Sequence, residues 1–146
     1  MHAERTLTVP RPPGAVFDYL ADFTRTNEWD PGTLETRRTS GDGGVGTTYA
    51  NLSLVLGQRT EATYTTVAHD RPSRLQVRGT GGAATVLLTV TITPVAAGSG
   101  SRVHLRTDIA LRGVRGLLAP LVLGRRLQRD ADEAVTQLER VLINRT

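Results

Sequence analysis

The sequence predicts an α+β fold in which an antiparallel sheet of about six or seven strands packs against one long C-terminal helix. Residues 117–143 carry apolar side chains at helical spacing, whereas the middle of the chain alternates apolar and polar residues between turn signals. At ~1.5 Å per residue such a helix spans about 40 Å, so it needs a broad apolar partner. No linker or low-complexity segment interrupts the pattern, and we expect one domain over residues 1–146.

The N-terminal quarter predicts one strand followed by two short helices. Residues 3–9 alternate, with Leu7 and Val9 on one face. Prolines 12 and 13 set up a helix over residues 14–21, because the first helical turn tolerates a residue without an N–H. A second short helix or turn over residues 23–29 ends at the turn signal of Asp30, Pro31 and Gly32.

The middle of the chain predicts the remaining strands, at residues 33–39, 47–56, 59–69, 74–79, 84–93 and 102–111. The last two alternate most cleanly and predict an antiparallel hairpin with one buried face. Residues 41–46 match the letters of a dinucleotide-binding glycine motif. That motif requires a helix after the glycines, whereas a strand pattern follows here, so we interpret the segment as a hairpin turn.

The C-terminal helix has an apolar stripe and a charged opposite face. The stripe consists of Leu127, Ala131, Ala134, Val135, Leu138, Val141 and Leu142. Upstream, residues 114–123 are apolar almost all round and contain Pro120, which predicts a kink or a junction between two helices. Exposing this apolar stretch to water would be costly, so we consider a lid or a homodimer contact for it.

Composition excludes several classes of function. The chain has no cysteine, which rules out disulfides, thiolate metal sites and cysteine nucleophiles. All 18 basic residues are arginine, but the net charge is only +4 and the arginines are scattered, so nucleic acid is not an indicated partner. No apolar run approaches the ~20 residues of a membrane-spanning helix, and no signal region follows the polar start. We therefore expect a cytoplasmic protein without a transmembrane segment.

Several short motifs occur in an order and spacing typical of a known superfamily. They are Val9-Pro10 with Pro12-Pro13, residues 16–22 (VFDYLAD), Trp29-Asp30-Pro31-Gly32, Val45-Gly46-Thr47 and Gly100-Ser101-Arg102-Val103, followed by the C-terminal helix. With them the chain resembles the START-related, pollen-allergen-like helix-grip superfamily, and within it the polyketide cyclase/dehydrase-like group. The resemblance implies a strongly bent sheet wrapped around the long helix, with an apolar cavity between them.

The wedge between such a sheet and helix is where we expect a ligand, because binding sites of this kind are apolar with a few orienting polar groups. The candidate ligand-binding residues are Phe23, Trp29, Tyr49, Asn51, Tyr64, Arg78, Leu118, Leu121 and Leu127. The polar candidates depend on which strand faces point inward, and the mixed alternation of residues 47–69 leaves this open. Trp29 stands beside Pro31 and Gly32, where a tryptophan more often packs a helix-loop corner than contacts a ligand.

Three hypotheses about function follow. The first is a carrier or sensor that binds a small hydrophobic molecule, lipid-, polyketide- or aromatic-like. The second is a polyketide cyclase or dehydratase, for which Tyr49, Tyr64 and Arg78 are the available polar groups. The third is a ribosome- or protein-binding module, whose signature would be clustered surface arginines. No catalytic residue is assignable, and neither a metal nor a cofactor is expected; the adjacent His69 and Asp70 indicate a solvated turn.

Overall fold

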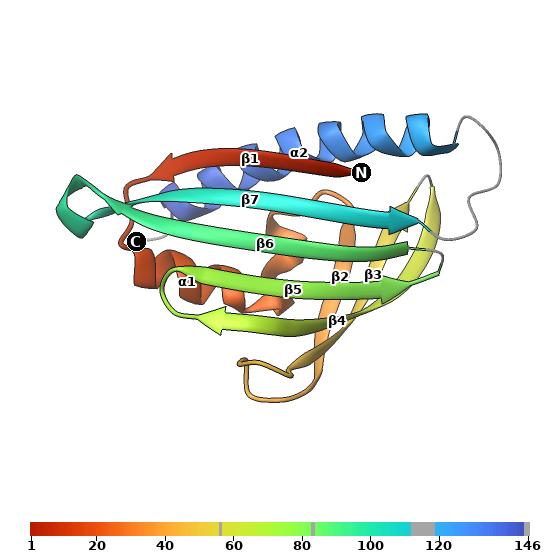
Figure 1. Ribbon diagram of the computed structural model, residues 1–146, viewed down its shortest axis with the longest axis horizontal. Coiled ribbons are helices and arrows are strands. Elements are labelled where there is room, and N and C mark those ends of the chain that lie inside the picture. Colours follow the sequence, from red (N-terminus) through yellow and green to blue (C-terminus); the bar gives the residue numbers. More distant parts are fainter. Residues whose placement is uncertain (56, 83, 112–118, 145–146) are drawn as a thin grey trace.

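The computed structural model describes residues 1–55, 57–82, 84–111 and 119–144 (Figure 1). Their elements occur in the order predicted. In chain order they are β1 (His2–Val9), α1 (Pro13–Ala21), the 3-10 helix η1 (Phe23–Glu28), β2 (Thr33–Ser40), β3 (Thr48–Val55), β4 (Gln58–Asp70), β5 (Arg74–Gly81), β6 (Ala84–Val95), the 3-10 turn η2 (Ala96–Gly98), β7 (Gly100–Leu111) and α2 (Ala119–Asn144).

The strands form one seven-stranded antiparallel sheet in the order β1-β7-β6-β5-β4-β3-β2. Strands β2 to β7 follow one another as a meander, and β1 joins the far side beside β7. The glycine segment 41–46 is the turn between β2 and β3, where Gly41, Gly43 and Gly46 have φ of 93°, 105° and 90°. These left-handed values suit glycine, so the hairpin-turn interpretation is confirmed.

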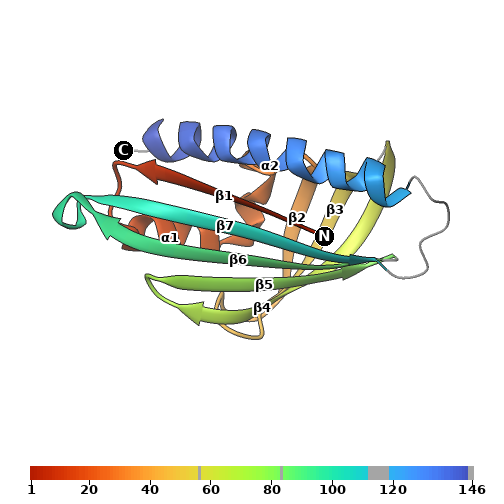
Figure 2. The same cartoon turned by 45° about the horizontal axis from the view of Figure 1, so that its top comes forward.

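The long helix lies across the concave side of the bent sheet and contacts strands near both of its edges (Figure 2). On the β1 side, the Arg5 guanidinium lies 2.8 Å from a carboxylate oxygen of Asp132, and the Gln128 amide donates to the His2 carbonyl at 3.0 Å. Near the opposite edge of the sheet, the Arg126 side chain donates a hydrogen bond to the Leu54 carbonyl of β3 at 3.2 Å. The sheet therefore curves around α2 from one edge strand to the strand next to the other edge, and the expected helix-grip fold is confirmed.

Pro120 lies in the first turn of α2, because the helix begins at Ala119. A proline in this position breaks no hydrogen bond of the helix, since the first N–H groups have no partner within it. The junction expected before Pro120 lies outside the described residues. Within those residues, no helix is both long and apolar enough to cross a bilayer.

The core fills one end of the space between sheet and helix. The predicted faces of β6 and β7 point inward, so that Val90, Ile92 and Val103 are buried, and α1 adds Val16 and Phe17. The C-terminal half of α2 completes this core with large side chains, of which Leu138 and Leu142 are buried. Burying such a leucine stabilises the fold by about 2 kcal/mol.

Candidate functional site

The other end of the same space is not filled by side chains. There α2 presents two alanines, Ala131 and Ala134, between Leu127 and Leu138, and Thr107 of β7 lines the space with them. These short side chains leave a cavity of about 200 Å³ between helix and sheet. A second hollow of about 40 Å³ lies next to it and shares Trp29, Thr107 and both alanines.

Four parts of the fold contribute to the cavity wall. The lining residues are Phe23, Trp29, Asp30 and Thr33 from η1 and the segment after it, Asn51 and Tyr64 from β3 and β4, Val86, Leu88, Thr107 and Ile109 from β6 and β7, and Leu127, Asp130, Ala131 and Ala134 from α2. The wall is therefore mostly apolar and aromatic, with a small number of polar groups. This is the composition expected of a site for a small molecule.

Asp30 is the polar group that the turn after η1 places in the cavity wall. One carboxylate oxygen accepts a hydrogen bond from the Gly32 amide at 3.2 Å, and the other accepts one from the Thr33 hydroxyl at 2.8 Å. Burial raises the pKa of Asp30 above its ordinary value, despite these two hydrogen bonds, and the charge of Asp130 raises it further. Asp30 can therefore hold a proton at a higher pH than a surface aspartate.

Asp130 enters the same cavity from the helix. It pairs with Arg126 one turn earlier, with a guanidinium nitrogen 3.4 Å from a carboxylate oxygen. Arg126 also donates to Leu54 of β3, so this arginine is already committed to holding the helix against the sheet. Arg126 and Asp130 thus form an i,i+4 ion pair within the helix, which leaves Arg126 unsuited to a free basic patch with Arg125 and Arg129.

Tyr64 points its ring into the cavity wall from β4. Its ring centroid lies 5.1 Å from that of Phe23, and on its other side it contacts Gly79 of β5. The hydroxyl makes no hydrogen bond to any of the described residues, and Tyr64 is part of the cavity wall. Burial, together with the charge of Asp30, raises the pKa of Tyr64 to about 12, so the phenol remains a neutral donor and acceptor near neutral pH.

Asn51 borders the cavity, but its amide mainly connects strands. It donates to the Thr36 hydroxyl at 2.9 Å and accepts from the Ser53 hydroxyl at 2.6 Å. Thr36 in turn shares a hydrogen bond with Thr26 of η1, whose hydroxyl donates to the Phe23 carbonyl. This buried network fixes η1 to β2 and β3, and thereby the position of Phe23 in the wall.

Five of the nine candidate residues from the sequence meet at this cavity: Phe23, Trp29, Asn51, Tyr64 and Leu127. Trp29 is also part of the core, so its ring packs in the core and borders the cavity at once. Tyr49 is buried, but its hydroxyl points toward the Ala21 carbonyl at 3.5 Å, away from the cavity. Leu121 is 53 % exposed and does not line the cavity, and Leu118 lies outside the described residues.

The expectation for Arg78 needs correction. Its neighbours Val77 and Gly79 are buried, whereas Arg78 is exposed. Alternation along β5 therefore places its side chain on the outer face of the sheet, opposite to the cavity. Cross-strand pairing agrees, because Arg78 stands beside Thr65 of β4 and Leu87 of β6 on that outer face.

The sequence interpretation missed Asp30 and Asp130 as site residues. Asp30 stands in a turn signal, and Asp130 stands on a helix face otherwise rich in charge, so each had an ordinary explanation. One signal for Asp130 was its position next to Ala131 in the apolar stripe. For Asp30, only the folded contact between η1 and α2 reveals its place.

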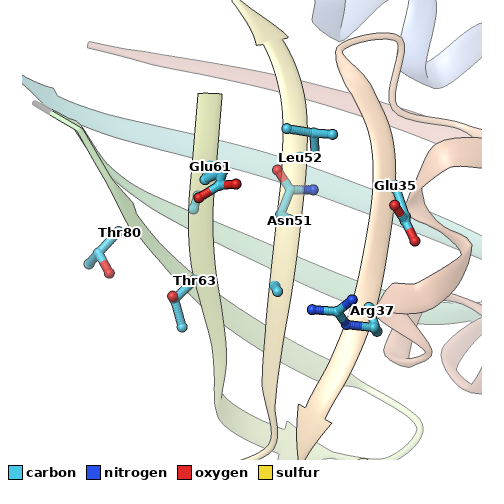
Figure 3. A pocket seen from close by; sticks show the side chains of 9 residues that line it. Glu35, Arg37, Asn51, Leu52, Glu61, Thr63 and Thr80 are labelled. Carbon is cyan, nitrogen blue, oxygen red and sulfur yellow. The ribbon is translucent and has the colours of Figure 1, made fainter. Parts of the chain in front are cut away.

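Several larger hollows lie elsewhere among the described residues, and two of them are clearly less suited to an apolar ligand. One, of about 500 Å³, is on the outer face of β2 to β5, where Glu35, Arg37 and Glu61 surround it (Figure 3). The other, of about 780 Å³, lies between α1 and the turn from β2 to β3 and is lined by several carboxylates. Neither is enclosed between helix and sheet. In the part of the chain that the structure describes, no three histidine, aspartate or glutamate side chains gather as a metal site would need.

Comparison with known families agrees with this architecture. Residues 1–142 match the family described as polyketide cyclase / dehydrase and lipid transport. The chain therefore belongs to this family. Comparison with curated protein sequences found no match.

Solved structures with the same fold cover almost the whole chain. The protein TTHA0849 from Thermus thermophilus is 16% identical with a TM-score of 0.79, covering 97% of both chains. The Zhui aromatase/cyclase from Streptomyces sp. R1128 is 18% identical with a TM-score of 0.73, covering 99% of this chain and 96% of the other. A START superfamily protein from Mycobacterium smegmatis is 13% identical with a TM-score of 0.73, covering 97% and 96%. At these identities the likeness establishes the fold.

Proposed function

We propose that this protein binds a small, largely apolar molecule in the cavity between α2 and the sheet. The observation that carries the proposal is the change of side-chain size along α2: Leu138 and Leu142 fill one end, whereas Ala131 and Ala134 leave the other open. An unfilled space in the protein interior lowers the free energy of unfolding, and a larger side chain that filled it would raise that free energy. Its retention is therefore best explained by an occupant.

The size of the cavity limits the occupant. An engineered cavity of about 150 Å³ lined by apolar side chains binds benzene. A space of about 200 Å³ accordingly suits a molecule of one substituted ring or a short chain. Membership in a family described by polyketide cyclisation and lipid transport supports such a ligand without specifying it.

The test compares two alanine-to-leucine variants. Ala134→Leu fills the cavity, whereas Ala110→Leu, at an exposed position of β7, is the matched control. Trp29 is the single tryptophan and lines the cavity, so its fluorescence reports binding of the neutral probe 2-phenylethanol. We expect the wild type and Ala110→Leu to bind the probe and Ala134→Leu to lose about tenfold or more in affinity. Equal binding by all three proteins would refute the proposal.

One observation favours a second candidate, a dehydratase or cyclase. Asp30 has a raised pKa and shares the cavity with the neutral phenol of Tyr64. A protonated Asp30 could donate its proton to the departing hydroxyl, which leaves as water, while the Asp130 carboxylate accepts the proton from the carbon next to the carbonyl. Tyr64 would donate a hydrogen bond to the carbonyl oxygen. The discriminating experiment is turnover of a β-hydroxy carbonyl compound on a small ring: product formation that Asp30→Asn abolishes, with binding retained, favours the enzyme over the carrier.

A further inference from the structure

The charged side chains in the described cavity wall are all acidic. Both charged side chains in the described wall, Asp30 and Asp130, are carboxylates. Asp130 has Arg126 as its cationic partner, but Asp30 has no ion pair with any described residue. Its two hydrogen bonds come from a backbone amide and a hydroxyl, which orient the carboxylate and leave its charge uncompensated. Asp30 is half-buried, and removing a charge from water without a counter-charge is costly.

The arginines at this end of α2 do not fill that role. Arg126 is divided between Asp130 and the Leu54 carbonyl. Arg5, which borders the small adjoining hollow, pairs with Asp132 on the outer side of the helix. When Asp30 is ionised, no described cation compensates its charge, and an occupant of the cavity could supply that counter-charge.

The rest of the wall suits a cation. The rings of Phe23, Trp29 and Tyr64 line the same space, and aromatic faces attract cations, more strongly where water is excluded. The Tyr64 hydroxyl has no partner among the described residues and offers a further acceptor. An ammonium group has three donors, which the carboxylate of Asp30 and the oxygen of Tyr64 begin to satisfy.

We propose that the cavity ligand is a small amine, bound as its ammonium ion with the nitrogen on Asp30 and the apolar body against the aromatic wall. This inference rests on the proposed function and adds the ligand's charge to it. The volume limits the amine to about one ring with a short chain. The raised pKa of Asp30 agrees, because it reflects partial removal from water together with the negative charge of Asp130.

The experiment compares three probes of nearly equal size, 2-phenylethylamine, 2-phenylethanol and phenylacetate, by Trp29 fluorescence at pH 7. We expect the amine to bind at least about tenfold more tightly than the alcohol, and phenylacetate to bind most weakly. In Asp30→Asn the amine should lose its advantage while the alcohol still binds. The matched control is Asp42→Asn, because Asp42 accepts from the Gly44 amide in a similar turn, exposed and outside the cavity.

The outcomes separate the two proposals. If the alcohol binds as well as the amine, or if the preference for the amine survives Asp30→Asn, the amine proposal is wrong and the binding function stands. If none of the three probes binds the wild type, both fail. Near-ultraviolet circular dichroism checks that Asp30→Asn is folded; should it not fold, the comparison of amine and alcohol on the wild type alone still decides.

Discussion

The ring of Tyr64 lies directly on Gly79 of the neighbouring strand, where a Cβ would come within 2.6 Å of the tyrosine Cε1 atom. The two residues stand opposite each other in the β4–β5 register, with their side-chain positions on the inner face. The missing side chain of Gly79 thus makes room for the ring, and Phe23 holds it from the other side. This contact sets where the Tyr64 hydroxyl meets the cavity.

Gly79→Ala should therefore displace Tyr64 and destabilise the protein. Overpacking of this kind costs about 1–3 kcal/mol, because neither ring nor strand can move freely. Urea unfolding measures the loss. The matched control is Gly124→Ala in α2, where a Cβ meets no atom within 4 Å and should stabilise the helix by roughly 0.5–1 kcal/mol. Equal effects of the two substitutions would contradict the tight contact at Gly79.

Leu138→Ala should be among the most destabilising substitutions in α2. Leu138 is 0 % exposed at the filled end of the core, and deleting a buried leucine side chain to the β-carbon costs about 2–5 kcal/mol. Leu121→Ala, at a position that is 53 % exposed, should change the free energy of unfolding by about 0.5 kcal/mol or less. Thermal and urea unfolding of both variants check the difference, and a small loss in Leu138→Ala would mean that α2 is not seated on the sheet.

Thr36→Val should weaken the attachment of η1. The Thr36 hydroxyl accepts from Asn51 and shares a hydrogen bond with Thr26, so valine leaves the buried amide nitrogen of Asn51 without its acceptor and removes one of the two hydrogen bonds of Thr26. We expect a loss of about 1–3 kcal/mol in unfolding free energy. Thr93→Val, at an exposed position of β6, is the control and should be nearly neutral. Hydrogen exchange of η1 amides that is unchanged in Thr36→Val would contradict the role of the network.

The pH dependence of stability should distinguish Asp30 from Asp18. The pKa of Asp30 is raised in the folded state, so its stabilising contribution is present below the ordinary value of 3.8 and is lost as the pH rises through the folded pKa. Asp30→Asn should therefore gain stability relative to the wild type as the pH rises from about 3 to 7. The measurement is the difference in unfolding free energy between the two proteins at each pH.

Asp18 supplies the control of opposite sign. The hydrogen bond from Arg71 lowers the pKa of Asp18, so its contribution is present above 3.8 and is lost as the pH falls. Asp18→Asn should lose stability relative to the wild type as the pH rises, by a small amount because the pair is exposed. A parallel pH dependence in both variants would contradict the buried environment of Asp30.

The fold was predictable because its signals are local. Alternation identified the inner faces of β6 and β7, and the spacing from Leu127 to Leu142 identified the face of α2 that meets them. The cavity wall was only partly predictable, because it depends on which distant residues meet. Arg78 was misplaced because the strand pattern around it did not fix the inner face, whereas the pairing of Tyr64 with Gly79 does.

A crystal structure of the wild type soaked with 2-phenylethanol tests the binding cavity most directly. We predict density for one ring between Trp29, Tyr64 and Ala134, with α2 still attached to both sides of the sheet. Density found only in the outer hollow of Figure 3, with the inner space closed by the protein's own side chains, would contradict it.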